Sequence, residues 1–183
     1  MIKTTISFTF CAFVLFISSI SISSAGDAFI IDTYKSLMGL NLDKVPAVHK
    51  KKMKITKTAD HDPESYKKAV SYMIDKNNGF LINLKNGNTL DHINFWEEKY
   101  QTQSGVKIGD ELCKVSKLYI NSKMHISTEE GVYMYLVTED GSLEFRFNIP
   151  RQIMSKYGFS GHPKPEEACS EQVDAIKLKQ ANK

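Results

Sequence analysis

The sequence lacks the short motifs that mark many enzymes. Its five histidines form no His-x-x-x-His or His-Glu-x-x-His pair, and neither Gly-x-Ser-x-Gly nor a phosphate-binding loop occurs. The net charge is only +3 at pH 7, so no strong overall field favours nucleic acid as a partner. We therefore expect a protein with no catalytic residues, cofactor, metal or nucleic-acid partner.

Long hydrophobic runs are missing after residue 25, so we expect no membrane span in that part of the chain. Residues 1–25 have the form of a secretory signal peptide, with Lys3, an apolar stretch over residues 6–22 and small residues up to Ala25. We predict cleavage after Ala25 and export of residues 26–183 to the periplasm, with secretion as the alternative. An uncleaved N-terminal anchor is the other interpretation, but the apolar stretch is short for that role.

Cysteine is scarce, and Cys11 lies inside the predicted signal peptide. Cys113 and Cys169 remain after processing. They lack Cys-x-x-Cys spacing and a neighbouring histidine cluster, which disfavours a redox or metal site. Because an isolated pair in an oxidising compartment usually becomes a disulfide, we predict a Cys113–Cys169 bond.

Two parts of the chain resemble each other in sequence. Tyr34 and Gly39 are spaced like Tyr100 and Gly105, and each glycine precedes an apolar-polar-apolar triplet. Residues 90–95 match residues 173–178 in the same order. We predict one α+β domain over residues 26–183, with an internal repeat over 34–96 and 100–179. Each unit would contribute a short helix and antiparallel strands to a largely antiparallel sheet.

Hairpin signals support this sheet. Residues 80–84 and 89–96 flank Asn86-Gly87, and residues 131–138 and 142–149 flank a turn at Gly141. In the strand predicted over residues 142–149, the alternating apolar residues Leu143, Phe145, Phe147 and Ile149 predict one buried face.

For two further segments the sequence pattern predicts the secondary structure less clearly. Asp110 is expected to cap a helix that buries Leu112 and Val115. Residues 66–74 fit a helix as well as a strand, and the repeat favours the strand.

A proline- and glycine-containing loop between Pro150 and Cys169 interrupts the second unit. Long loops in small domains often carry binding residues, so we name Tyr157, Phe159 and His162 as candidate contacts. Other aromatic residues include some that strand alternation leaves outward, although most are expected in the core or in cross-strand pairs: Phe95, Trp96, Tyr100, Tyr133 and Tyr135.

Charged clusters give weaker signals. Lys50, Lys51 and Lys52 belong to a basic run that is expected to be a solvated surface, with contact to an anionic envelope polymer or acidic partner as the alternative. The segment 60–62 reads Asp-His-Asp, but three adjacent residues do not easily converge on one metal ion. A polar turn before Pro63 is the preferred interpretation.

The segment 105–109, Gly-Val-Lys-Ile-Gly, precedes a helix with Leu112, Val115 and Tyr119. This pattern resembles small exported bacterial proteins of unknown function, including a sigma-E-regulated lipoprotein family. Two tandem units of helix and antiparallel strands are similar to the architecture of β-lactamase inhibitor proteins, which implies enzyme binding without catalytic residues. The Ser-Gly-x-x-Tyr signature of c-type lysozyme inhibitors is absent, because Ser104-Gly105 and Ser160-Gly161 lack the tyrosine.

These observations favour an exported, non-catalytic binding protein that contacts a protein partner in the cell envelope, as an inhibitor or immunity protein does. The alternative is a cryptic periplasmic hydrolase or metal-dependent enzyme whose carboxylates or histidines are brought together only by the fold. Fold analogy alone does not decide between them.

Overall fold

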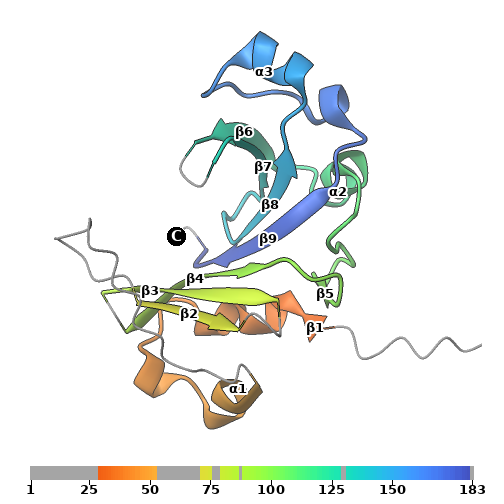
Figure 1. Ribbon diagram of the computed structural model, residues 1–183. Helices are drawn as coiled ribbons and strands as arrows, with labels where there is room; N and C mark the ends of the chain where they lie inside the picture. The colour runs from red at the N-terminus through yellow and green to blue at the C-terminus, as the bar shows by residue number, and fades with distance from the viewer. Residues whose placement is uncertain (1–28, 53–70, 76–78, 87, 129–130, 182–183) are drawn as a thin grey trace, which may run out of the picture.

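An antiparallel sheet runs through the described part of the chain (Figure 1). This computed structural model describes residues 29–52, 71–75, 79–86, 88–128 and 131–181. Within those ranges the large sheet has seven strands in the order β2-β3-β4-β9-β8-β7-β6, and every neighbouring pair is antiparallel. The strands are β2 (Ser71–Asp75), β3 (Phe80–Lys85), β4 (Thr89–Phe95), β6 (Lys123–Ser127), β7 (Tyr133–Val137), β8 (Leu143–Asn148) and β9 (Val173–Lys179).

A small parallel sheet and several short helices complete the described fold. Strand β1 (Phe29–Ile30) pairs with β5 (Tyr100–Gln101). The helices are α1 (Ala47–Lys52), α2 (Leu112–Leu118) and α3 (Arg151–Tyr157), together with the 3-10 helices η1 (Ile31–Leu37), η2 (Leu42–Lys44) and η3 (Pro165–Ala168). The predicted α+β class with a largely antiparallel sheet is confirmed.

Both predicted hairpins form. Strands β3 and β4 pair around the Asn86 turn, where Asn86 has a φ of 53°, a left-handed conformation that asparagine tolerates better than most residues. In the turn between β7 and β8, the carboxylate of Asp140 accepts hydrogen bonds from the Ser142 backbone N–H at 3.0 Å and the Thr138 hydroxyl at 2.7 Å. These bonds lower the pKa of Asp140, although its partial burial alone would raise that pKa.

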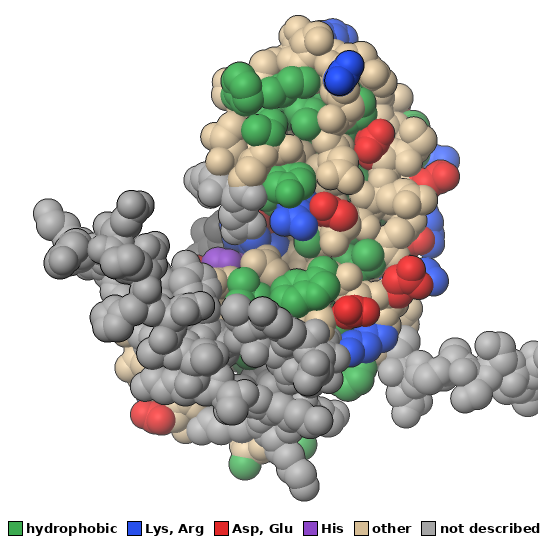
Figure 2. All heavy atoms as spheres, in the orientation of Figure 1, with side chains coloured by type: hydrophobic (Ala, Val, Ile, Leu, Met, Phe, Trp, Pro, Cys, Tyr) green, Lys and Arg blue, Asp and Glu red, His purple; other side chains and the backbone are tan. Residues whose placement is uncertain are grey.

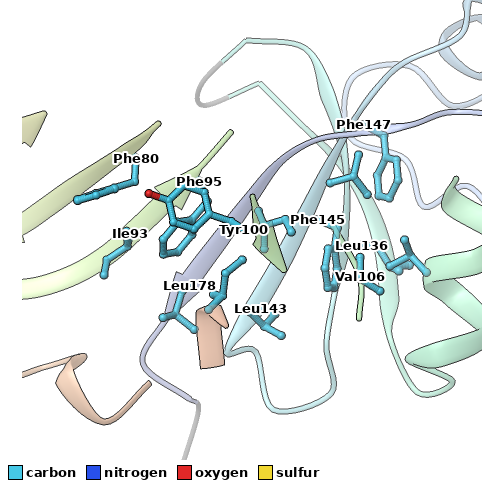
Figure 3. Packing of buried hydrophobic residues seen from close by; sticks show 14 of the residues in the cluster. Phe80, Ile93, Phe95, Tyr100, Val106, Leu136, Leu143, Phe145, Phe147 and Leu178 are labelled. Carbon is cyan, nitrogen blue, oxygen red and sulfur yellow. The ribbon is translucent and has the colours of Figure 1, made fainter. Parts of the chain in front are cut away.

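One face of the sheet is packed into the core. Leu143, Phe145 and Phe147 are buried as their alternation predicts, and Ile149, which follows the end of β8, is partly buried against the same core. In Figure 3, Phe80, Phe95 and Tyr100 lie together on one half of the sheet, and the Phe95 and Tyr100 ring centres are 4.7 Å apart. Such rings supply much of the hydrophobic stabilisation of a small domain.

Strand β9 joins the two halves of this core. Leu178 lies opposite Ile93 of β4 on one side and opposite Leu143 of β8 on the other. All three side chains are almost fully buried, so β4, β9 and β8 share one continuous apolar layer. Helix η1 contacts β9 from the core side with its buried Ile31, Tyr34 and Leu37.

The predicted disulfide between Cys113 and Cys169 is present, and it joins α2 to the end of η3. Leu112 and Val115 of α2 are buried as expected. The expected cap at Asp110 is wrong: α2 begins at Leu112, its N-cap Glu111 makes no side-chain cap bond, and Asp110 instead accepts from the Lys107 N–H at 2.9 Å and from Lys114. A carboxylate can satisfy a nearby loop amide as readily as a helix amide, and the pattern does not distinguish the two.

The two segments of the predicted repeat place their last strands side by side, because β4 and β9 are sheet neighbours. Gly39 and Gly105 both have a positive φ, at 80° and 81°. The repeat itself stays a prediction. Residues 71–75 of the ambiguous segment form a strand, while residues 66–70 lie outside the described ranges.

Candidate binding site on the open sheet face

The second face of the sheet is built from the residues that alternate with the core. Side chains at every second position of a strand point to the same face, so the register decides which of them meet. In one row Asn94 lies opposite Lys177, and Lys177 lies opposite Glu144. In the next row Ala175 lies opposite Arg146, which lies opposite Tyr135, and His125 follows on β6.

These rows border a hollow of about 740 Å³. Pockets of this size take a small ligand or a few residues of a peptide. Figure 2 shows Lys and Arg side chains together with a histidine in the hollow between the two halves of the molecule. The lining comes from β3, β4, β9, β8 and β7 and the positions beside them: Leu81, Asn83, Leu84, Lys85, Asn86, Asp91, His92, Asn94, Trp96, Tyr135, Arg146, Ala175 and Lys177.

Arg146 is fixed in the hollow from two sides. Its Nε donates to Asp174 Oδ1 at 2.8 Å, and its guanidinium lies 4.4 Å from the centre of the Tyr133 ring. Partial burial opposes the charged form, but the hydrogen bond and negative charge of Asp174 outweigh it and raise the pKa of Arg146. The guanidinium therefore stays charged and oriented.

Two lysines of β9 lie beside the carboxylate of Glu144. Lys177 Nζ lies 3.8 Å from Glu144 Oε2 and 5.7 Å from the centre of the Tyr135 ring, and its side chain is only 11% exposed. Lys179 pairs with the other oxygen of Glu144. The carboxylate of Glu144 therefore contacts the ammonium groups of two neighbouring lysines.

Neutral polar groups also line the hollow. Asn83 is 4% exposed, and Asn94 lies in the next strand of the same lining. Side-chain amides can both donate and accept hydrogen bonds, so these two residues can contact polar groups of a ligand. Trp96, which follows β4, is 36% exposed and adds an aromatic surface at the rim.

The loop residues chosen from the sequence lie elsewhere. Phe159 is 62% exposed, and His162 Nδ1 lies 3.2 Å from the Met124 carbonyl at β6. Tyr157 has a structural contact, because its hydroxyl donates to Glu167 Oε2 at 2.6 Å. Lys156, Tyr157 and the Lys164 N–H all donate to Glu167 and lower the pKa of this carboxyl to about 2.

The basic run lies on α1, apart from the hollow lining. Lys50, Lys51 and Lys52 belong to its backbone, but their side chains are not described. Among the described residues that line the hollow there is none from the loop between Pro150 and Cys169, and the binding roles of the loop residues and of these lysines stay predictions. The residues missed from the sequence were Asn83, Asn94, Arg146, Ala175 and Lys177. Strand alternation was the available signal; it suggested that some aromatic residues point outward, but it did not separate Trp96 and Tyr135, which line the hollow, from Phe95 and Tyr100, which are in the core.

No group of three or more His, Cys, Asp or Glu side chains suited to a metal ion occurs within the ranges that the structure covers. The Asp-His-Asp segment 60–62 lies outside those ranges. In the same part of the chain, none of the helices combines the length and hydropathy that a bilayer span requires.

The fold and the hollow together define an α+β protein whose antiparallel sheet presents a cationic and aromatic face. No protein-family profile matches the chain, and no curated protein matches it. Among solved structures it is similar to the crystal structure of the uncharacterized protein yfeY from Escherichia coli, with a TM-score of 0.43 and 16% identity, over 61% of this chain and 73% of that chain. This is a distant likeness to a bacterial protein, and the families named from the sequence stay predictions.

Proposed function

We propose that this protein is an exported, non-catalytic binding protein that docks a protein partner on the open face of its sheet. The observation that carries the proposal is the meeting of Trp96, Tyr135 and Arg146 around one hollow. Trp, Tyr and Arg are the residue types that supply most binding energy at protein interfaces when they surround a desolvated pocket. An inhibitor-like or immunity-like role follows from this mode of action.

The charged groups in and beside the hollow support binding because they are held in place. Asp174 fixes Arg146, Glu144 accepts from Lys179, and Asp91 Oδ2 lies 2.9 Å from His92 Nδ1. Side chains that are already ordered lose little conformational entropy when a partner binds. The face is therefore preorganised for contact.

The compartment is part of the proposal. Residues 1–25 are predicted to direct export, and the Cys113–Cys169 disulfide fits an oxidising compartment such as the periplasm. An envelope protein would then be the partner that this face meets.

Site-specific photo-crosslinking tests this function. The full-length chain is expressed with p-benzoylphenylalanine at position 96, 159 or 120, and cells are irradiated before the envelope proteins are separated. Ile120 is the matched control, since it is 85% exposed and borders a separate hollow with Lys35. We expect a discrete protein adduct from position 96 and none from position 120.

Other outcomes would contradict the proposal in different ways. An adduct at position 159 without one at position 96 would move the contact to the α3 loop and remove the sheet face. If none of the three positions gave a protein adduct, the binding function itself would be rejected.

A further inference from the structure

Arg146 has hydrogen-bonding capacity that the fold does not use. Its Nε bond to Asp174 is the one hydrogen bond its guanidinium makes among the described residues. The two terminal amino groups therefore have no partner within that set. Because a guanidinium presents its donors as a planar fork, a group held as rigidly as this one suits the two oxygens of a carboxylate.

The charged residues around Arg146 also favour a carboxylate as the ligand. Lys85, Arg146 and Lys177 line the hollow together with one carboxylate, Asp91. Two further carboxylates lie beside these groups, because Asp174 accepts from Arg146 and Glu144 is shared between Lys177 and Lys179. The Lys177 side chain is only 11% exposed, and such a charge interacts with an incoming anion more strongly than an exposed lysine does.

Ala175 leaves room beside the guanidinium. It lies opposite Arg146 in the sheet, and it borders the hollow with only a methyl group. Phe95 pairs with Ile176, so the next residue of the chain, Trp96, lies on the Ala175 side of the same hollow. An apolar side chain of a partner can therefore occupy the space between Trp96 and Arg146.

We propose that the hollow binds a partner segment in which an Asp or Glu carboxylate reaches Arg146 and Lys177 while a neighbouring apolar side chain is seated over Ala175 beside Trp96. This inference rests on the proposed function and adds the chemistry of the partner. Asn83 and Asn94 supply amide groups for the backbone of the bound segment.

Peptide selection tests this chemistry directly. Protein purified after expression of the full-length chain is used to select from a phage library of random dodecapeptides. We expect enriched peptides to carry an acidic residue next to an apolar one. For the tightest peptide, replacing its Glu by Gln, or its Asp by Asn, should weaken binding by about 10-fold, since a hydrogen bond to a charged group is lost.

The Arg146→Gln variant identifies the residue that makes this contact. Its preference for the acidic peptide over the amide twin should fall to the part that Lys177 supplies, whereas the matched Arg151→Gln variant on α3 should keep the full preference. Circular dichroism confirms that both variants are folded.

Three results would overturn the inference. The first is a set of selected peptides that bind without any acidic requirement, and the second is an acid preference that Arg146→Gln leaves undiminished. The third is binding of polygalacturonate fragments at this face while no peptide binds. In each case a protein adduct from position 96 would still support the proposed function. Failure of the inference about partner chemistry can therefore be distinguished from failure of the proposed binding function.

Discussion

Arg146 of β8 donates from Nε to Asp174 of β9 across 2.8 Å, at the point where the register between these two strands shifts. The shift leaves Asp174 beside Arg146 while Ala175 takes the opposing position in the ladder. A local irregularity of the sheet thus brings a carboxylate to orient the arginine and a small residue to leave space for a ligand. β-Bulges commonly redirect side chains near functional sites.

Asp174→Asn tests whether this pair orients the guanidinium. Because the pair is partly exposed, we expect a loss of only about 1 kcal/mol in the free energy of unfolding. The binding of an acidic peptide should fall more clearly, by about three- to tenfold, as Arg146 gains freedom. Urea unfolding and fluorescence titration measure the two effects. The control Glu166→Gln, at an exposed position of η3, should change neither quantity.

The disulfide is predicted to stabilise the fold through loop closure. Cys113 and Cys169 are separated by 56 positions, and the chain-entropy estimate for such a loop is about 4 kcal/mol. The Cys113→Ser/Cys169→Ser double variant should lose stability of that order in urea unfolding. Exported wild-type protein should take up iodoacetamide only after reduction. Labelling of two thiols before reduction would show that the bond does not form in the cell.

Glu167 gives the loop a pH dependence. The ammonium of Lys156, the hydroxyl of Tyr157 and the Lys164 N–H lower its pKa from a usual value near 4.5 to about 2 in the folded state. Since the folded pKa lies below the unfolded one, the stabilisation is complete above about pH 4.5 and is lost as the pH falls toward 2.

The measurement compares wild type with Glu167→Gln in urea at several pH values. The variant should be less stable at pH 6, and the difference should shrink progressively below pH 4.5 as wild-type Glu167 takes up its proton. A gap between the two proteins that stays constant from pH 6 to pH 3 would be inconsistent with the Lys156–Glu167 contact.

Two phenylalanines, one buried and one exposed, test how the core is packed. Phe145 is fully buried, and its ring centre lies 5.1 Å from that of Tyr119, whereas Phe159 is 62% exposed. Phe145→Ala should cost about 3–5 kcal/mol in the free energy of unfolding because it leaves a cavity. Phe159→Ala should stay within about 0.5 kcal/mol. Equal losses in the two variants would mean that β8 does not lie against the core.

Local signals predicted the parts of this fold that depend on nearby residues. Asn86-Gly87 identified a hairpin because few residues tolerate a left-handed turn, and the alternation of Leu143, Phe145 and Phe147 identified a buried strand face. The Cys113–Cys169 bond followed from having a single pair after the predicted export step.

The hollow could not be predicted because it depends on pairing between distant segments. Asn94 meets Lys177, and Trp96 lies near Ala175, only because β4 pairs with β9 in one particular register. Sequence patterns give the face on which each strand points its side chains, but not the neighbour it pairs with. Tyr157 shows the converse, since an aromatic residue in a loop suggested an interface and the structure uses its hydroxyl to hold Glu167.

The central claim is that the partner occupies the space over Ala175, and a single substitution that fills this space tests it. Ala175→Met removes no polar group, and its effect on affinity for the protein crosslinked from position 96 can be measured by surface plasmon resonance. Ala47→Met, at an exposed position of α1, is the matched control. We predict that Ala175→Met weakens binding by at least about 10-fold, as expected for overpacking of a filled pocket, while Ala47→Met binds like wild type. Equal affinity of wild type and Ala175→Met would contradict the account, because the partner could not then lie in the hollow.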